Sequence, residues 1–182
     1  MFKAVLFDMD GLLFDSERVS AYFIKDAARA QGYAIGDDTL IAMLGVTAAV
    51  SQKMLTDAAP GLDVERVWNE YAQGMFSLAK QGKMPLKAGA IELLDALAAR
   101  GIPAAVATSN SEYAVKLYID HAGIADRFSA IAARADDLRS KPAPDLFLKA
   151  ADMLRVPPEG CLVLEDSMNG VKAGRAAGMT VC

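Results

Sequence analysis

The sequence is poor in histidine and cysteine, and each shortage argues against particular kinds of site. Among 182 residues there is one histidine, His121, so neither a histidine-rich metal centre nor a Ser–His–Asp triad is expected. The two cysteines, Cys161 and Cys182, have neither metal-site spacing nor the number that a disulfide framework requires. Because stable disulfides belong to oxidising compartments, a reduced, cytoplasmic location is the default expectation.

Long apolar runs and an excess of positive charge are also missing. No run reaches the roughly 18 residues of a membrane span, and the start MFKAVLFDMDG is too short and too soon charged for a signal peptide. A net charge of −4 argues against nucleic acid or an anionic membrane as the main partner. A small phosphorylated substrate stays compatible, because a bound cation reverses the local charge. The oligomeric state that we expect is a monomer.

What the sequence does contain is an alternation of short apolar strands and amphipathic helices. The expected strands are the runs Lys3–Phe7, Ala104–Ala107, Ala130–Ala133, Cys161–Leu164 and Met179–Cys182. The expected helices lie between them, at Ala88–Arg100, Ser111–His121, Asp145–Leu154 and Gly170–Ala177. Strands that alternate with helices predict right-handed βαβ units, so the fold class is α/β with a doubly wound parallel sheet.

One stretch breaks this alternation. From about Ser16 to Lys83 the periodicity is helical, so we expect an all-helical cap that is inserted after the first strand. The predicted domains are a catalytic core, residues 1–15 and 85–182, and a helical cap, residues 16–84. Asp15 and Ser16 form either the hinge between them or the N-cap of the first helix.

Polar residues follow the predicted strands at their carboxyl ends, which is where open parallel sheets bind ligands. Asp8-Met9-Asp10-Gly11 follows the first strand, and Thr108-Ser109-Asn110 follows the second. Lys141 lies in the loop after the third strand, and Glu165-Asp166 comes directly after the fourth. These groups would converge on one edge of the sheet, which is the layout of an active site.

The pair Asp8 and Asp10 can serve phosphoryl transfer if the chain turns after Asp8, and Gly11 permits such a turn. A carboxylate can attack phosphorus and form an aspartyl-phosphate, and Asp8 is suited to that role. Asp10 could then protonate the leaving oxygen and later deprotonate the attacking water. An acidic pair alone is weak evidence, so the rest of the site has to support it.

The clustered negative charge of this site predicts a metal ion beside the pair Asp8 and Asp10. A phosphate dianion would be repelled by the clustered carboxylates unless cations intervene, and Mg²⁺ prefers hard oxygen ligands. The predicted metal ligands are Asp8, Asp166 and, through its backbone carbonyl, Asp10.

The predicted phosphate ligands come from two other segments. Lys141 supplies a second positive charge, which would hold Asp8 and the phosphoryl oxygens together in the transition state. The Thr108 hydroxyl and the amides of Ser109 and Asn110 stand just before a predicted helix, whose N-terminus is a natural phosphate cradle.

Together these segments resemble the four motifs of the haloacid dehalogenase superfamily. The matching segments are FDMDG, the apolar run that ends in Thr108, SKPAPD at Ser140–Asp145 and LEDSMNG at Leu164–Gly170. The resemblance covers essentially the whole chain and is closest to the capped branch that includes β-phosphoglucomutase and phosphoglycolate phosphatase. It implies a Rossmann-like core, Mg²⁺ and the roles given above for Asp8, Asp10, Thr108, Lys141 and Asp166, with Glu165 as a further metal candidate. Members of the family usually continue past the fifth strand, so we expect Met179–Cys182 to be less well covered.

Within the family, two departures favour hydrolysis. The β-phosphoglucomutase pattern has a histidine ten residues after the second motif aspartate, where this sequence has Ser20. It also has an arginine three residues after a cap glycine, and after Gly45 that position is Ala48. Dehalogenases lack the second aspartate, which is present here as Asp10. We therefore predict a phosphatase acting on a sugar, polyol or small acid phosphate. A phosphosugar mutase and a non-catalytic phosphate-binding module are the alternatives.

Three further residues have simpler interpretations. Asp145 is expected to cap the helix that follows it, and Asn169 to help turn the chain into the last helix. The cap lysines are expected to be solvated, as surface lysines usually are, and Lys53 is the one to test for substrate contact.

Overall fold

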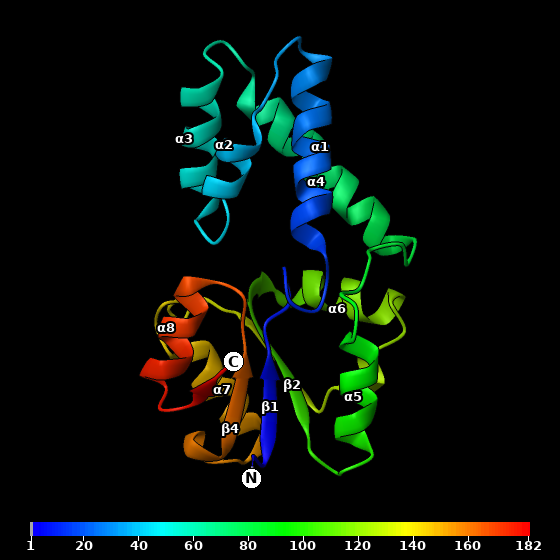
Figure 1. The fold of residues 1–182 in the computed structure, drawn as a ribbon, viewed down its shortest axis with the longest axis vertical. Coiled ribbons are helices and arrows are strands. Elements are labelled where there is room, and N and C mark those ends of the chain that lie inside the picture. Colours follow the sequence, from blue (N-terminus) through cyan, green and yellow to red (C-terminus); the bar gives the residue numbers. More distant parts are fainter. Residues whose placement is uncertain (1) are drawn as a thin grey trace.

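The computed structural model describes residues 2–182, and at its centre lies a five-stranded sheet whose paired strands are all parallel. The strands are β1 (Ala4–Phe7), β2 (Ala104–Ser111), β3 (Ala130–Arg134), β4 (Cys161–Leu164) and β5 (Thr180–Val181). Their order is β3-β2-β1-β4-β5, so the chain crosses from one side of β1 to the other between β3 and β4 (Figure 1). The predicted α/β fold with a doubly wound parallel sheet is thereby confirmed.

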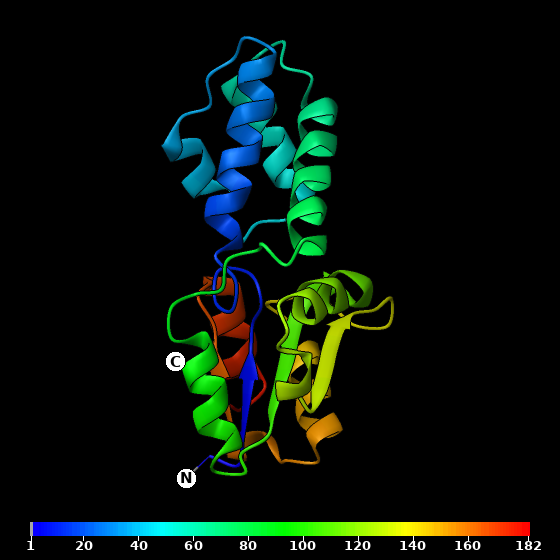
Figure 2. The ribbon, with the colours of Figure 1, turned by 90° about the vertical axis from the view of Figure 1, so that its right-hand side faces the viewer.

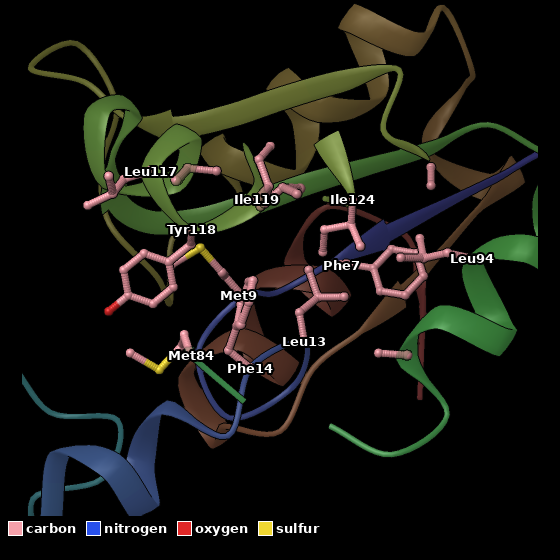
Figure 3. Close-up of a cluster of buried hydrophobic side chains, with 14 of the residues drawn as sticks. Phe7, Met9, Leu13, Phe14, Met84, Leu94, Leu117, Tyr118, Ile119 and Ile124 are labelled. Carbon is pink, nitrogen blue, oxygen red and sulfur yellow. The ribbon is translucent and has the colours of Figure 1, made fainter. Parts of the chain in front are cut away.

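Helices cover both faces of this sheet. The elements outside the sheet in this part of the chain are α5 (Ala90–Ala98), α6 (Glu112–His121), α7 (Asp145–Leu154), α8 (Met168–Ala176) and two short 3-10 helices, Ala125–Arg127 and Pro158–Gly160. The central strand β1 is buried on both sides: Val5 and Phe7 join the cluster under α5 and α6, which Figure 3 shows, whereas Ala4 and Leu6 join the cluster under α7 and α8. This double burial explains why β1 is a continuous apolar run.

The other four helices form a separate group above the carboxyl ends of the strands (Figures 1 and 2). They are α1 (Ser16–Ala30), α2 (Asp37–Ala42), α3 (Ala48–Ala58) and α4 (Val64–Lys80), which we call the helical insert. The insert has an apolar cluster of its own, in which Ile24, Leu55 and Val67 are buried. No helix within residues 2–182 is long and apolar enough to cross a bilayer.

Two linkers connect the insert to the sheet, and they pair with each other. Asp15 N donates to Pro85 O at 2.8 Å, Lys87 N donates to Leu13 O at 2.9 Å, and Phe14 forms an antiparallel bridge with Leu86. The chain therefore enters and leaves the insert through two adjacent, hydrogen-bonded segments. The exact division into core and cap after residues 15 and 84 stays a prediction.

Asp15 occupies the N-cap position of α1, which is one of its two predicted interpretations. Its side chain accepts no hydrogen bond from a backbone amide of the first turn. Its carboxylate instead lies 3.3 Å from Lys87 Nζ on the second linker and 2.6 Å from Arg18 Nε. The contact with Lys87 ties one linker to the other, and the hinge role of Asp15 and Ser16 stays a prediction.

Most predicted strands and helices are found within two residues of their predicted ends, with one larger difference. The second strand extends to Ser111 instead of ending at Ala107, because Ser111 pairs with Arg134 of β3 after a register shift. The last helix begins at Met168 rather than Gly170, because the side chain of Ser167 accepts a hydrogen bond from Gly170 N and caps it.

Candidate active site

Asp8 directly follows β1, so its side chain emerges at the carboxyl edge of the sheet, where the residue is 8% exposed. Its Oδ1 accepts a hydrogen bond of 2.5 Å from Lys141 Nζ, which the loop between β3 and α7 brings to this edge. The same ammonium lies 4.8 Å from the centroid of the Phe147 ring. A buried cation is thus held between a carboxylate and an aromatic face, a position that attracts it from both sides.

Glu165, at the end of β4, is the second carboxylate that faces Lys141. Lys141 Nζ donates to Glu165 Oε1 at 3.0 Å, and the other oxygen accepts from the backbone amides of Asp166 and Ser167 at 2.8 and 3.3 Å. Ser167 Oγ also donates to Oε1 at 3.1 Å. A Cβ on Gly170 would lie 1.4 Å from Oε1, so only glycine leaves room for this carboxylate.

Asp10 lies two residues beyond Asp8, and the side-chain amide of Asn110 fixes its carboxylate. Gly11 adopts φ +76°, the left-handed conformation that reverses the chain, and its N–H donates to Ser16 Oγ at 3.3 Å. Asn110 Nδ2 donates to Asp10 Oδ2, and Asn110 N donates to Thr108 Oγ1 at 3.2 Å. The ends of β1 and β2 are thereby joined through polar side chains.

Three carboxylates at this edge lie close enough to share one cation. Asp8, Glu165 and Asp166 each offer an oxygen, and these atoms lie within 4.8 Å of one another. Asp166 leans over the turn, where a Cβ on Gly11 would come within 1.9 Å of its Oδ2. Hard oxygen donors at this spacing fit Mg²⁺.

The electrostatics of the site point to an uncompensated negative charge. Burial raises the pKa of Asp8 to about 7, and repulsion from Glu165 adds to the rise, although Lys141 opposes it. Desolvation and repulsion from Glu165 raise the pKa of Asp166 to about 6. Desolvation also raises the pKa of Asp10, against the hydrogen bonds from Ser16 and Asn110. Ionising all these carboxyl groups together calls for a second cation beside Lys141.

The structure brings most of the predicted site residues together at one edge. Those that contact or closely approach another predicted site residue are Asp8, Asp10, Thr108, Asn110, Lys141 and Asp166. Ser109 is exposed, and within residues 2–182 no hydrogen bond joins its side chain to the others. The chemical roles assigned to these residues stay predictions.

One expectation for a residue near the site changes, whereas the expectation for Lys53 in the insert holds. Asp145 does not cap α7: it is the first residue of the helix, and its carboxylate accepts hydrogen bonds of 2.8 and 3.0 Å from the Arg139 side chain. This pair closes the loop that carries Lys141. Lys53 is exposed as expected, but its Nζ is paired with Asp57 Oδ2 at 2.7 Å.

Sequence reasoning missed Ser167 and Phe147, and it gave Glu165 only a minor place. The segment Ser167–Gly170 has the spacing of an N-cap serine whose oxygen meets an amide three residues on, so Ser167 could have been found. Nothing in the sequence marks Phe147 as the ring beneath Lys141, because that contact depends on how α7 packs against the sheet.

Comparison with known proteins gives a family that spans nearly the whole chain. The family of haloacid dehalogenase-like hydrolases matches residues 2–178 of this chain. The predicted resemblance is therefore confirmed, and so is the prediction that the chain is a hydrolase.

Individual relatives agree with this match. Protein CbbY of Rhodobacter capsulatus is 32% identical over 98% of this chain and 83% of its own length. A probable pseudouridine-5'-phosphatase of Drosophila melanogaster is 32% identical over 97% of this chain and 78% of its own. Protein SUPPRESSOR OF QUENCHING 1 of Arabidopsis thaliana is 34% identical, but the chain spans only 17% of that protein's length.

A solved structure matches the fold over almost the whole chain. It is a HAD family hydrolase of Deinococcus radiodurans with bound phosphate and sodium, with a TM-score of 0.83 and 30% identity. The similarity covers 99% of this chain and 79% of that one.

Proposed function

This chain belongs to the haloacid dehalogenase-like hydrolases, and from that premise we propose that it is a Mg²⁺-dependent phosphatase of small phosphate monoesters with Asp8 as its nucleophile. The observation that carries the proposal is the buried group of Asp8, Lys141 and Glu165. Lys141 Nζ lies 2.5 Å from the Asp8 carboxylate and 3.0 Å from that of Glu165, and Asp10 follows two residues after Asp8. Named relatives that act on or bind phosphate compounds support the same chemistry.

Asp8 and Asp10 have different roles in the proposed reaction. An Asp8 oxygen attacks phosphorus, the bond from phosphorus to the alcohol oxygen breaks, and Asp10 gives its proton to that oxygen. Asp10 then takes a proton from water as the water oxygen attacks phosphorus, which breaks the bond to Asp8 and releases phosphate. The raised pKa of Asp10 suits a group that must first hold a proton at neutral pH.

The remaining residues bind the phosphoryl group and the metal. Lys141, Thr108 and the amides of Ser109 and Asn110 hold the phosphoryl oxygens, and the Lys141 ammonium favours the ionised form of Asp8. Asp8, Asp166 and the Asp10 carbonyl are the proposed Mg²⁺ ligands, and Glu165 is close enough to join them. Bound Mg²⁺ would supply the positive charge that lets phosphate approach this acidic edge.

Two positions in the helical insert favour hydrolysis over a mutase. Ser20 Oγ lies 3.8 Å from Met75 Sδ, so an alcohol group packed on a thioether stands where the mutase pattern has a histidine. Ala48 opens α3, where the mutase pattern has an arginine for the second phosphate. Without these groups a bisphosphate is held less well, and water is the favoured acceptor of the phosphoryl group. A sugar, polyol or small acid phosphate is the proposed substrate.

The proposal is tested by hydrolysis of a generic aryl phosphate. We expect phosphate release with Mg²⁺, loss of that activity with a chelator, and loss of at least about a thousandfold in Asp8→Asn. Asp57→Asn, which removes an exposed acid of the insert, is the control and should keep full activity. Full activity in Asp8→Asn would contradict the mechanism.

A second assay separates the two reactions. With a hexose 1-phosphate and a trace of bisphosphate, a phosphatase releases inorganic phosphate faster than it forms the 6-phosphate. The opposite order would favour the mutase.

A further inference from the structure

Asn169, in the first turn of α8, reaches out of the core to the helical insert. Its Nδ2 donates a hydrogen bond of 3.0 Å to the backbone oxygen of Gly45, in the segment Met43–Val46 between α2 and α3. Among residues 2–182 it is the one hydrogen bond found between the insert and the core residues 90–182. Figure 1 shows this segment hanging from the insert over α8.

The contact lies on the opposite side of the sheet edge from the other attachments of the insert. There, Met75 of α4 packs in the core cluster that contains Tyr118 of α6, and the rings of Phe76 and Tyr113 lie 6.2 Å apart. In Figure 1 the lower end of α4 stands over α6, whereas the Met43–Val46 segment stands over α8. The carboxyl end of β1, which Asp8 directly follows, lies between the two.

The backbone at Gly45 is shaped for this approach. Gly45 adopts φ +70°, and a Cβ there would lie 3.6 Å from Ser167 Cβ. Any other residue would be strained by the backbone conformation, although its Cβ would only reach ordinary van der Waals contact with Ser167. The segment therefore meets the core at the loop whose Ser167 donates to the Glu165 carboxylate.

We propose that Asn169 is a positioning residue for the reaction, whose amide holds the Met43–Val46 segment of the insert against the Glu165–Ser167 loop. In doing so it keeps the insert close to the core on the α8 side of Asp8. The role rests on the proposed phosphatase function, but the contact itself can be tested without turnover. A residue of this kind acts on the population of the closed form, and thus on apparent substrate affinity, because substrate binds productively only to that fraction.

The first test follows amide hydrogen exchange of the Met43–Val46 segment in the metal-free protein. We expect exchange to be about three- to tenfold faster in Asn169→Ala, since one hydrogen bond contributes about 0.5–1.5 kcal/mol. Lys172→Ala, one turn later on the exposed side of α8, is the matched control and should exchange like the unaltered protein. Equal exchange in both variants would overturn the proposal, whether or not the protein proves to be a phosphatase.

The second test is the split between KM and kcat in the aryl phosphate assay. Asn169→Ala and the isosteric Asn169→Asp, whose carboxylate cannot donate to Gly45 O, should raise KM about three- to tenfold and change kcat less than twofold. A structural defect would instead lower the active fraction, so kcat would fall at constant KM, and that result would also overturn the proposal.

Gly45→Ala tests the same contact from the insert, and it stays informative if the Asn169 variants fail to fold. We expect the same rise in KM, and less than additive effects in Gly45→Ala combined with Asn169→Ala, because both act on one contact. Unaltered KM in Gly45→Ala, or fully additive effects, would contradict the role.

Discussion

The carboxyl groups of Asp8 and Asp166 have raised pKa values, about 7 and about 6, because burial and neighbouring acids disfavour their ionised forms. A carboxyl whose pKa is higher in the folded protein than the unfolded value of 3.8 binds its proton more tightly when folded. Its contribution to stability is therefore full at low pH and is lost as the pH rises toward the folded pKa. In the exposed pair of Asp145 with Arg139, the pKa of the aspartate is lowered. The stability that this pair contributes is therefore lost as the pH falls below the usual pKa of an aspartate, which is a lower interval than that of Asp8 and Asp166.

The metal-free protein should accordingly lose stability as the pH rises from about 4.5 to about 7.5. Asp8→Asn should flatten this slope and raise the free energy of unfolding at pH 7.5 by about 1–3 kcal/mol, since one pKa unit corresponds to about 1.4 kcal/mol. Lys141 keeps Glu165 as a partner in this variant. Urea unfolding in a chelator measures the effect, and Asp57→Asn should retain the original slope. A stability that climbs over this interval would contradict the assigned pKa shifts.

Gly170 tests how tightly the Glu165 carboxylate is held. In Gly170→Ala the new Cβ would occupy the place of Glu165 Oε1, so Lys141 loses one of its two carboxylate partners. We expect a loss of about 1–3 kcal/mol in unfolding free energy from overpacking, and at least about a tenfold loss of kcat. Gly36→Ala is the control, because Gly36 has open space around it and an ordinary φ of −72°. If both variants behaved alike, the packing around Glu165 would not matter for the site.

At the scale of elements, the loop between β3 and α7 depends on a pair at its surface. The backbone N–H and two side-chain nitrogens of Arg139 donate hydrogen bonds of 2.8 to 3.0 Å to the Asp145 carboxylate. Lys141 lies between these two residues in the sequence. An exposed ion pair adds little stability, about 0.2–1 kcal/mol. Its larger effect is to restrict the loop that presents Lys141 to Asp8.

Asp145→Ala should therefore separate activity from stability. We expect kcat/KM to fall at least about threefold, because a small displacement of Lys141 weakens its contact with the phosphoryl group. The unfolding free energy should change by less than about 1 kcal/mol. Lys116→Ala, which breaks the exposed pair with Glu112 on α6, is the matched control and should leave both unchanged. A proportional loss of activity and stability would argue against the loop's separate role.

The elements that the sequence predicts best are those with a strong local pattern. The strand Cys161–Leu164 and the helix Asp145–Leu154 are found with the predicted ends, because apolar runs and helical periodicity decide them. The true length of β2 could not be predicted, because Ser111 pairs with Arg134 of β3 only after a register shift. The partner of Asp145 could not be predicted either. An acidic residue in the first turn is usually expected to cap the helix, but both carboxylate oxygens of Asp145 accept hydrogen bonds from Arg139, six residues earlier in the loop.

For the whole molecule, the fold class and the meeting of the motifs at one edge were predictable, since strand ends with polar residues converge in any doubly wound sheet. How the insert meets the core was not. The contact of Asn169 with Gly45 joins residues 124 positions apart, and neither has a local pattern that names the other. The same holds for Lys141 on the Phe147 ring. Contacts between separately packed units depend on their relative placement, which periodicity does not encode.

The paired linkers have a consequence for how such a protein can change over evolutionary time. Because Asp15 and Pro85, like Leu13 and Lys87, are hydrogen-bonded neighbours, the chain leaves the core and returns to it at the same point. Sequence between these anchors can be lengthened, shortened or exchanged without shifting the register of any strand. New substrate preferences can then arise by replacing one module, while the residues proposed for phosphoryl chemistry stay where the sheet holds them.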